Sequence, residues 1–336
     1  MKSAIKAVSE RKNLSVEEAA RAMSIMLSGE ATQAQIGAYL TALRMKGETI
    51  DEIIGSASVL KEKAEHIHPN LSMYIDLVGT GGDYAYTFNI STTSAFVAAA
   101  AGLPVAKHGN RAISSKSGAG DVLEALGVNI IPGIEVVEKC VEEVGIGFMF
   151  APAFNKAMKY VGQARSEMGI RSIFNILGPM ANPSGAKCML IGVYDQTLCE
   201  PIATALMHLG VENGMVVSGA NGTDEISTVS ETTVAEIKDD VVTVYTITPE
   251  QFGIKRATAE DIMGGDGEAN AKITRDILSG ADKGPKRDIV LLNAGAALYA
   301  GKKASTIEEG MKLAAEAIDS GKAMATLDKL VEYSNK

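Results

Sequence analysis

A glycine-rich stretch near residue 80 carries the residue types that bind phosphate. An apolar segment over 73–78 runs directly into Gly79-Thr-Gly-Gly-Asp83. Glycines let backbone N–H groups approach phosphate oxygens without a Cβ in the way, and a helix that we expect from about Ser91 would add its dipole. The segment 84–120 contains no Asp or Glu, although the chain has a formal charge of −9. The pattern therefore predicts an anion-binding loop.

Taken alone, these glycines would more often form a turn than a phosphate site, and they lack the GxGxxG and GxxxxGK[ST] spacings. Asp83 would repel phosphate unless it accepts hydrogen bonds within the loop, faces a hydroxyl group or helps to bind a cation. A sugar phosphate bound together with Mg²⁺ therefore explains Asp83 better than phosphate alone does.

A second polar stretch, Lys107-His-Gly-Asn-Arg111, follows a predicted strand. A solvated basic loop is usually the better interpretation of such a short run. Here the run is followed by Ser114-Ser-Lys-Ser-Gly-Ala-Gly120, whose hydroxyls and glycines suit the wrapping of a pyrophosphate. We interpret His108 as a binding residue rather than a general base, because no carboxylate lies near it in the sequence.

Two further positions suit the same chemistry. Asp224-Glu225 follows a predicted strand and a glycine-containing loop. Acidic loop tips are usually only solvated, but a site that binds a polyanion without many lysines needs metal ions, and hard cations take carboxylate ligands. Arg165 lies in a second segment without carboxylates, 144–166, and could bind a substrate carboxylate with both guanidinium nitrogens; its alternative is a surface helix arginine.

The composition limits the classes of protein to consider. At 336 residues, with 46% apolar and 22% charged residues, the chain has the composition of a soluble globular protein with one or two domains. Its 32 basic and 41 acidic residues disfavour nucleic acid or an anionic membrane as the main partner. Cys140, Cys188 and Cys199 lack CxxC spacing, which argues against disulfides or a zinc site and favours the cytoplasm. No segment approaches the roughly 20 apolar residues of a membrane helix.

The elements that must position these residues change in type near residue 70. The first 65 residues predict successive helices, each opened by a capping box: Ser15 with Glu18, Thr32 with Gln35, and Thr49 with Glu52. After residue 70, short apolar runs alternate with helix-length segments, which is typical of a parallel sheet with helical crossovers. We expect strands at 74–78, 104–107, 145–150, 189–194 and 215–219, and a hairpin of 233–237 with 241–247.

Loops that follow parallel strands gather at one sheet edge, where α/β proteins usually bind ligands. The segment 162–183 fits neither a strand nor a helix. Gly178-Pro179 and Asn182-Pro183 indicate that it is a shaped connection.

Together, five motifs in this order closely resemble the anthranilate phosphoribosyltransferase family of tryptophan biosynthesis, and the likeness covers nearly the whole chain. The motifs are Gly79-Thr-Gly-Gly-Asp, Asn89-Ile-Ser-Thr, Lys107-His-Gly-Asn-Arg-Ala-Ile-Ser-Ser-Lys-Ser-Gly, Ile170-Arg-Ser-Ile-Phe-Asn-Ile-Leu-Gly-Pro-Met-Ala-Asn-Pro and Thr223-Asp-Glu-Ile-Ser.

The resemblance implies an α/β fold with a smaller all-helical domain and a mostly parallel central sheet, as in nucleoside phosphorylases and phosphoribosyltransferases of this two-domain type. The helical domain would comprise 1–70 with part of 165–190, and the α/β domain 71–164 and 191–336. The resemblance also implies a homodimer formed through the helical domain. Phosphoribosyl diphosphate (PRPP) and two Mg²⁺ ions per active site would bind between the domains.

Carried over by motif, the metal residues would be Ser91, Asp224 and Glu225, and anthranilate would meet Gly79, Asn110 and Arg165. No catalytic general base is assigned. The substrate-binding residues would be Gly79, Gly82, Asp83, Thr87, Asn89, Ser91, Thr92, Lys107, His108, Gly109, Asn110, Arg111, Ser114, Ser115 and Arg165.

The chain departs from the family pattern at three positions. Ala119 stands where the family commonly has serine, Asn155 replaces a usual histidine, and Gln163 replaces a usual proline. The last two lie near the expected channel for the aromatic acid. Two alternative functions remain open: a pyrimidine nucleoside phosphorylase of related fold, and a noncatalytic relative that binds nucleic acid, against which the charge of −9 argues.

Overall fold

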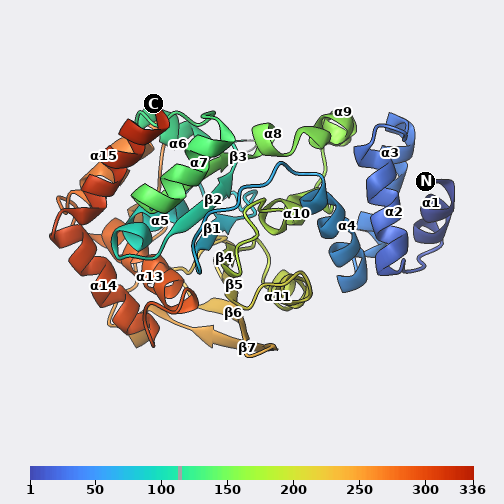
Figure 1. Cartoon of the computed structure of the whole chain (residues 1–336). Helices are drawn as coiled ribbons and strands as arrows, with labels where there is room; N and C mark the ends of the chain where they lie inside the picture. The colour runs from blue at the N-terminus through green and yellow to red at the C-terminus, as the bar shows by residue number, and fades with distance from the viewer. Residues whose placement is uncertain (113–115) are drawn as a thin grey trace.

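A helical bundle forms one end of the molecule, on the right in Figure 1. The computed structural model describes residues 1–112 and 116–336. The bundle consists of α1 (Lys2–Ser9), α2 (Val16–Leu27), α3 (Gln33–Lys46) and α4 (Ile50–Glu62). All three predicted capping boxes are confirmed. In each, the hydroxyl of the N-cap residue accepts from the backbone N–H of the residue three positions later, and the side chain of that later residue accepts from the backbone N–H of the N-cap residue. The helices therefore start where the sequence indicates.

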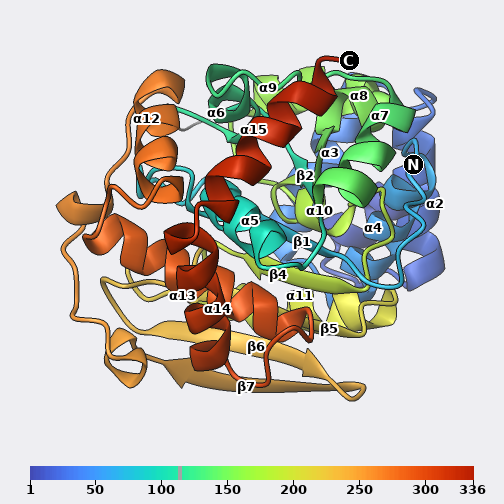
Figure 2. The same ribbon diagram turned by 60° about the vertical axis from the view of Figure 1, so that its left-hand side comes forward.

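A mixed sheet lies beside the bundle. Its strands are β1 (Ile75–Gly79), β2 (Val105–Gly109), β3 (Ile146–Phe150), β4 (Cys188–Gly192), β5 (Asn213–Gly219), β6 (Thr232–Lys238) and β7 (Val241–Ile247). The spatial order is β3-β2-β1-β4-β5-β6-β7, with β1 to β5 parallel and β6 and β7 antiparallel at one edge, the lower edge in Figure 2. Every predicted strand is confirmed, with ends displaced by one or two residues.

Alternate residues of the strands point into two separate cores, as the twofold period of a strand requires. Leu190 of β4 belongs to the core on one face of the sheet that includes α5 (Ile90–Ala100) and α13 (Pro285–Ala300). Ile191, the next residue, joins the core that includes α11 (Cys199–His208) and the helical bundle. The sheet is therefore covered on both faces, and its apolar runs are buried.

The remaining helices complete these layers (Figures 1 and 2). They are α6 (Ala119–Ala125), α7 (Ile134–Lys139) with a π-helical turn at Cys140–Val144, α8 (Ala151–Phe154), α9 (Lys159–Met168), α10 (Phe174–Met180), α12 (Gly267–Leu278), α14 (Ile307–Asp319) and α15 (Lys322–Ser334). Short 3₁₀ turns occur at Lys156–Met158, Gln196–Leu198, Pro249–Phe252 and Glu260–Ile262. Within the residues described, no helix is both long and apolar enough to cross a membrane.

The segment 162–183, which the sequence leaves without an assignment, is largely helical. It contains most of α9 and all of α10, and Pro179 lies inside α10, one residue before that helix ends. The helix-breaking residues Gly178 and Pro179 therefore do not prevent a helix here. The reason is packing, since Ile176 and Leu177 are buried in the core of the helical bundle. A buried apolar face outweighs the weak local propensity of the sequence.

Candidate active site

A cavity of about 710 Å³ opens at the carboxyl-terminal edge of the parallel strands, where α/β sheets usually bind ligands. It is lined on one side by loops of the sheet and on the other by α9 and the connection to α10. Ser114 and Ser115 lie outside the described residues. All the other predicted site residues line this cavity: Gly79, Gly82, Asp83, Thr87, Asn89, Ser91, Thr92, Lys107, His108, Gly109, Asn110, Arg111, Arg165, Asp224 and Glu225.

The glycine loop after β1 needs its glycines for two different reasons. A Cβ on Gly79 would stand 2.2 Å from Asp224 Oδ2, so no larger residue fits between the loop and that carboxylate. Gly81 and Gly82 adopt φ of +66° and +72°, in the left-handed region that side chains other than glycine rarely adopt. From the sequence, we expect these glycines to let backbone N–H groups approach phosphate. The structure shows that close approach to Asp224 is the stricter requirement.

Both predicted metal-binding carboxylates accept hydrogen bonds from backbone N–H groups, and Asp224 is buried whereas Glu225 is half-buried. Gly81 N donates to Asp224 Oδ2 at 2.7 Å, and Ser91 N, in the first turn of α5, donates to Glu225 Oε1 at 3.0 Å. Burial, reinforced by the neighbouring Asp83, raises the pKa of Asp224 to about 7. Burial and the charge of Asp224 also raise the pKa of Glu225. The site therefore concentrates negative charge that the protein alone does not neutralise.

These residues fit Mg²⁺, although no group of three or more His, Cys, Asp or Glu ligands is preassembled among the described residues. Mg²⁺ is commonly held by one or two carboxylates, several waters and substrate phosphates, and this cavity offers carboxylates of that kind. Thr80 and Thr92 also line the cavity, and their hydroxyls are buried without a hydrogen-bond partner in the described part of the chain. Buried hydroxyls normally have partners, so both point to a ligand.

Lys107, predicted as a substrate-binding residue with a solvated basic loop as the alternative, is buried and lines the cavity. Its side chain is buried, its ammonium donates to the carbonyl of Leu77, and it lies in the electrostatic field of Asp76. Burial lowers the pKa of Lys107 and raises the pKa of Asp76 to about 6. Asp76 Oδ1 accepts from His108 N at 3.2 Å, and its Oδ2 accepts from Asn182 Nδ2 at 2.6 Å. Sequence reasoning missed Asp76, whose signal is a carboxylate inside an apolar strand.

His108 is buried, and its ring nitrogens are used by the protein. Asn155 Nδ2 lies 3.3 Å from His108 Nε2, and a second bond joins the ring to the backbone of Gly178. An amide nitrogen only donates, so Nε2 accepts and the proton resides on Nδ1, which meets the Gly178 carbonyl. Burial lowers the pKa of His108 to about 4. The imidazole is therefore neutral at physiological pH and is not placed to act as a general base.

Asn155 and Gln163, two of the departures from the family pattern, are in different surroundings. Neither lines the cavity. Asn155 is buried and reaches the cavity through His108. Gln163 is exposed on α9 and donates to Glu167 Oε1 at 2.9 Å. Of these two residues, only Asn155 therefore contacts a residue that lines the cavity.

The three arginines of the cavity have different partners. Arg111 is paired with Glu124 and lies 3.6 Å from Asp121. Arg165 has no ion pair among the described residues. Its guanidinium carbon lies 5.1 Å from the centre of the Phe174 ring, and burial lowers its pKa. Arg165 therefore offers an uncompensated guanidinium to the cavity, as a carboxylate ligand requires.

Sequence reasoning missed Arg171, which also lines the cavity. Arg171 Nη2 donates to the carbonyl of Gly82, and its guanidinium lies over the rings of Tyr194 and Tyr84, at 4.0 and 5.4 Å from their centres. The sequence indicates Arg171 only weakly as a site residue, because the segment without carboxylates that contains Arg165 ends before Glu167.

Known proteins are similar to this chain over its whole length. Two models of the glycosyl transferase family match it: the helical bundle domain over residues 2–64 and the a/b domain over residues 71–324. Anthranilate phosphoribosyltransferase from Acetivibrio thermocellus is 55% identical over 335 residues, covering 100% of this chain and 97% of that relative.

Solved structures agree with these matches. Anthranilate phosphoribosyltransferase from Thermus thermophilus has a TM-score of 0.94 at 41% identity, over 99% of each chain. The Saccharomyces cerevisiae protein of the same name, in complex with PRPP and Mg, has a TM-score of 0.89 at 26% identity, over 100% of this chain and 99% of that one.

Proposed function

The chain belongs to the anthranilate phosphoribosyltransferase family, and we propose that it transfers the phosphoribosyl group of PRPP to the amine of anthranilate, giving N-(5-phosphoribosyl)anthranilate and pyrophosphate. It is then a pentosyltransferase of tryptophan biosynthesis. The observation that carries this proposal is one cavity that is lined by Arg165, which has no ion pair among the described residues, by the glycine loop, and by Asp224 and Glu225. A carboxylate acceptor and a metal-bound diphosphate would use these two sets of residues.

The residues suit catalysis by positioning and electrostatics. Departure of pyrophosphate builds positive charge on the ribose, and the attacking aromatic amine is a weak nucleophile. Arg165 would hold the anthranilate carboxylate so that the amine faces C1 of the ribose, which converts an encounter of two molecules into a step within one complex. No strong base is required, and neutral His108, with both nitrogens engaged, is interpreted as part of the binding surface.

Ser91, Asp224 and Glu225 would hold Mg²⁺, and we propose two ions per active site. Bound Mg²⁺ would neutralise charge on the leaving pyrophosphate. The backbone N–H groups of Gly82 and Asp83, from which no described residue accepts a hydrogen bond, would face the diphosphate beside the first turn of α5. The unpartnered hydroxyls of Thr80 and Thr92 support this arrangement.

We further propose a homodimer formed through the helical domain, and residence in the cytoplasm. Cys140, Cys188 and Cys199 are buried free thiols, which suits a reducing compartment. Light scattering after size-exclusion chromatography measures the mass in solution, and a monomer of 35.2 kDa would contradict the dimer.

The matches favour phosphoribosyl transfer over the pyrimidine nucleoside phosphorylase alternative. The charge of −9 argues against a nucleic-acid-binding role. The direct test follows the fluorescence of anthranilate after PRPP and Mg²⁺ are added. We expect the signal to fall only when all components are present, and an unchanged signal with product absent by mass spectrometry would reject the proposal.

A further inference from the structure

Arg171 joins segments that lie far apart in the sequence. It belongs to the short connection between α9 and α10, in which Gly169 adopts φ of +61° and ends α9. Its guanidinium donates to the carbonyl of Gly82 in the glycine loop and lies 4.0 Å from the centre of the Tyr194 ring, just after β4. One cation therefore connects the loop that follows β1 with the chain that follows β4 and with the helical side of the cavity.

The contacted loop has an unfavourable backbone conformation. Besides Gly81 and Gly82, the non-glycine residues Tyr84 and Tyr86 adopt φ of +56° and +53°. Such angles persist only where surrounding contacts hold them. The ends of the loop are tied, since Gly81 N donates to Asp224 and the Tyr86 carbonyl accepts from Gly264 N at 2.9 Å. Between these ends, the loop is contacted from outside by Arg171 at the Gly82 carbonyl and by Asp224 at the side chain of Asp83.

The bond to Gly82 has a geometric consequence for Asp83. A trans peptide is planar, and its carbonyl and N–H point in opposite directions. By holding the Gly82 carbonyl, Arg171 sets the direction of the Asp83 N–H. No described residue accepts a hydrogen bond from the N–H of Gly82 or Asp83. Asp83 is also the charge that acts on buried Asp224.

The surroundings of Arg171 argue against a simple surface ion pair. It forms no salt bridge with any described carboxylate, although Asp195 lies within its electrostatic field. Arg44 and Glu48 of the helical bundle region act on the same ring, Tyr194. The guanidinium thus contacts a carbonyl and two aromatic rings. These contacts fix the position of the guanidinium relative to the glycine loop.

We propose that Arg171 is a positioning residue for the diphosphate half of the site: from the Tyr194 ring it holds the Gly82–Asp83 peptide so that the free N–H groups and the Asp83 carboxylate face PRPP with its metal. This inference rests on the proposed function. The two cavity arginines that form no ion pair among the described residues would then have different roles. Arg165 would bind anthranilate, and Arg171 would position the loop that binds PRPP.

The kinetic test compares Arg171→Ala with Arg165→Ala in the full-length protein. Arg171→Ala should raise the KM for PRPP at least tenfold and change the KM for anthranilate less than twofold, whereas Arg165→Ala should do the reverse. Equal effects of Arg171→Ala on both substrates, or an unchanged KM for PRPP, would overturn the proposal. A wild-type protein without transferase activity would instead reject the proposed function and leave the loop to be tested as follows.

Chymotrypsin cleavage at exposed Tyr84 and Tyr86 reports on the loop without substrate. Arg171→Ala should be cleaved there at least fivefold faster than wild type at an unchanged melting temperature. Equal cleavage rates would contradict the proposal. Should Arg171→Ala fail to fold, Tyr194 provides the second pair of variants: Tyr194→Phe keeps the ring and should behave as wild type, while Tyr194→Ala should raise both the cleavage rate and the KM for PRPP. Identical behaviour of these two variants would also overturn the proposal.

Discussion

At the scale of single residues, the site is built from charges whose partners are incomplete. Asp224 and Glu225 accept backbone N–H groups but face no sufficient positive charge, and Arg165 faces no carboxylate among the described residues. Groups of this kind lower the stability of the empty protein, and ligands that complete them recover that loss on binding. At these positions, the charges that bind ligands therefore reduce the stability of the protein without ligands.

The double variant Asp224→Asn/Glu225→Gln, which replaces both carboxylates by amides, tests whether these charges reduce stability. Both pKa values are raised in the folded protein. Between about pH 4 and pH 7 the folded state then binds more protons than the unfolded state, so wild type loses stability as pH rises. Amide oxygens still accept from Gly81 and Ser91. We expect the double variant to exceed wild type by about 1–3 kcal/mol at pH 8 and by less at pH 4, measured by denaturant unfolding in EDTA.

The same variant should lose the Mg²⁺ dependence of PRPP binding, which calorimetric titration with and without Mg²⁺ measures. Wild-type Mg²⁺ dependence would show that the metal assignment is wrong. A stability difference that does not vary with pH would contradict the role of burial.

A second prediction at this scale concerns His108. Its ring should stay neutral, with the proton on Nδ1, down to about pH 5, since its pKa is lowered to about 4. In Asn155→Asp a carboxylate replaces the amide beside Nε2, and we expect the pKa of His108 to rise by about 1–3 units. Gln163→Glu adds the same charge at an exposed position without contact to the ring, and should leave that pKa unchanged.

Nitrogen-15 NMR of the imidazoles follows both variants, and the chain has only four histidines. Equal shifts in the two variants would mean that Asn155 acts through net charge rather than through contact with His108.

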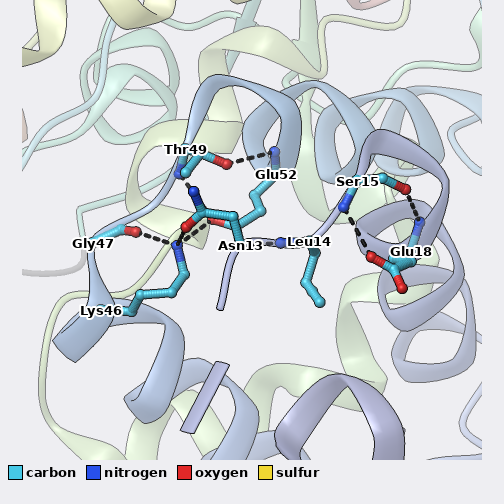
Figure 3. A network of polar contacts seen from close by, with 8 residues as sticks. All are labelled: Asn13, Leu14, Ser15, Glu18, Lys46, Gly47, Thr49 and Glu52. Atoms are coloured by element: carbon cyan, nitrogen blue, oxygen red, sulfur yellow. Dashed lines mark hydrogen bonds and ion pairs between the residues drawn. The ribbon is translucent and has the colours of Figure 1, made fainter. Parts of the chain in front are cut away.

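At the scale of elements, buried polar groups connect helices as well as line the cavity. In the helical bundle, Lys46 at the end of α3 and Glu52 in the first turn of α4 form an ion pair of 2.9 Å with side-chain exposures of 4% and 0% (Figure 3). Lys46 Nζ also donates to Asn13 Oδ1 at 3.0 Å and to the carbonyl of Gly47 at 2.6 Å. Glu52 accepts from Leu14 N and Thr49 N, at 3.0 and 2.8 Å. The pair thus ties the starts of α2 and α4 to the end of α3.

Lys46→Met should destabilise the protein by about 3–5 kcal/mol, because it leaves Glu52 charged, buried and without a cation. The exposed pair of Lys12 with Glu10 is the control, and Lys12→Met should leave the melting temperature close to that of wild type. The double variant Lys46→Met/Glu52→Gln should recover part of the loss. Thermal unfolding followed by circular dichroism compares the four proteins, and similar losses for both lysine variants would show that burial is not decisive.

At the scale of the whole molecule, the cavity lies between parts that belong to different cores. Ile90 of α5 lies in the core that covers one face of the sheet, whereas Val161 of α9 lies in the core of the helical bundle. A ligand that fills the cavity therefore contacts both parts and should stabilise their arrangement.

We expect PRPP together with Mg²⁺ to raise the melting temperature by about 5 °C at 100 times the dissociation constant, since such saturation adds about 2.7 kcal/mol. PRPP in EDTA should produce little shift, because the cavity carboxylates repel the free polyanion. Mg²⁺ alone is the second control. Thermal shift measurements test all three conditions, and an equal shift with PRPP in EDTA would contradict the need for metal.

Much of this molecule was determined by signals within short stretches of sequence. Capping boxes, the alternation of apolar residues and glycines after strands involve residues at most a few positions apart, and the corresponding helices, strands and loop are confirmed. The predicted site residues within the described parts of the chain all line the cavity, and many of them do so because they follow strands that end at one sheet edge. The segment 162–183 could not be assigned, because its helices depend on a core supplied by other parts of the chain.

Tertiary structure decided the partners of the charged residues. Arg171 meets Gly82 across 89 positions and Gly81 meets Asp224 across 143, and no local pattern encodes such pairs. Folding likewise buries Lys107 and gives it the Leu77 carbonyl and Asp76 as partners, which no local pattern indicates. Electrostatic energies depend on separation and on access to water, and both are set only when the chain is folded.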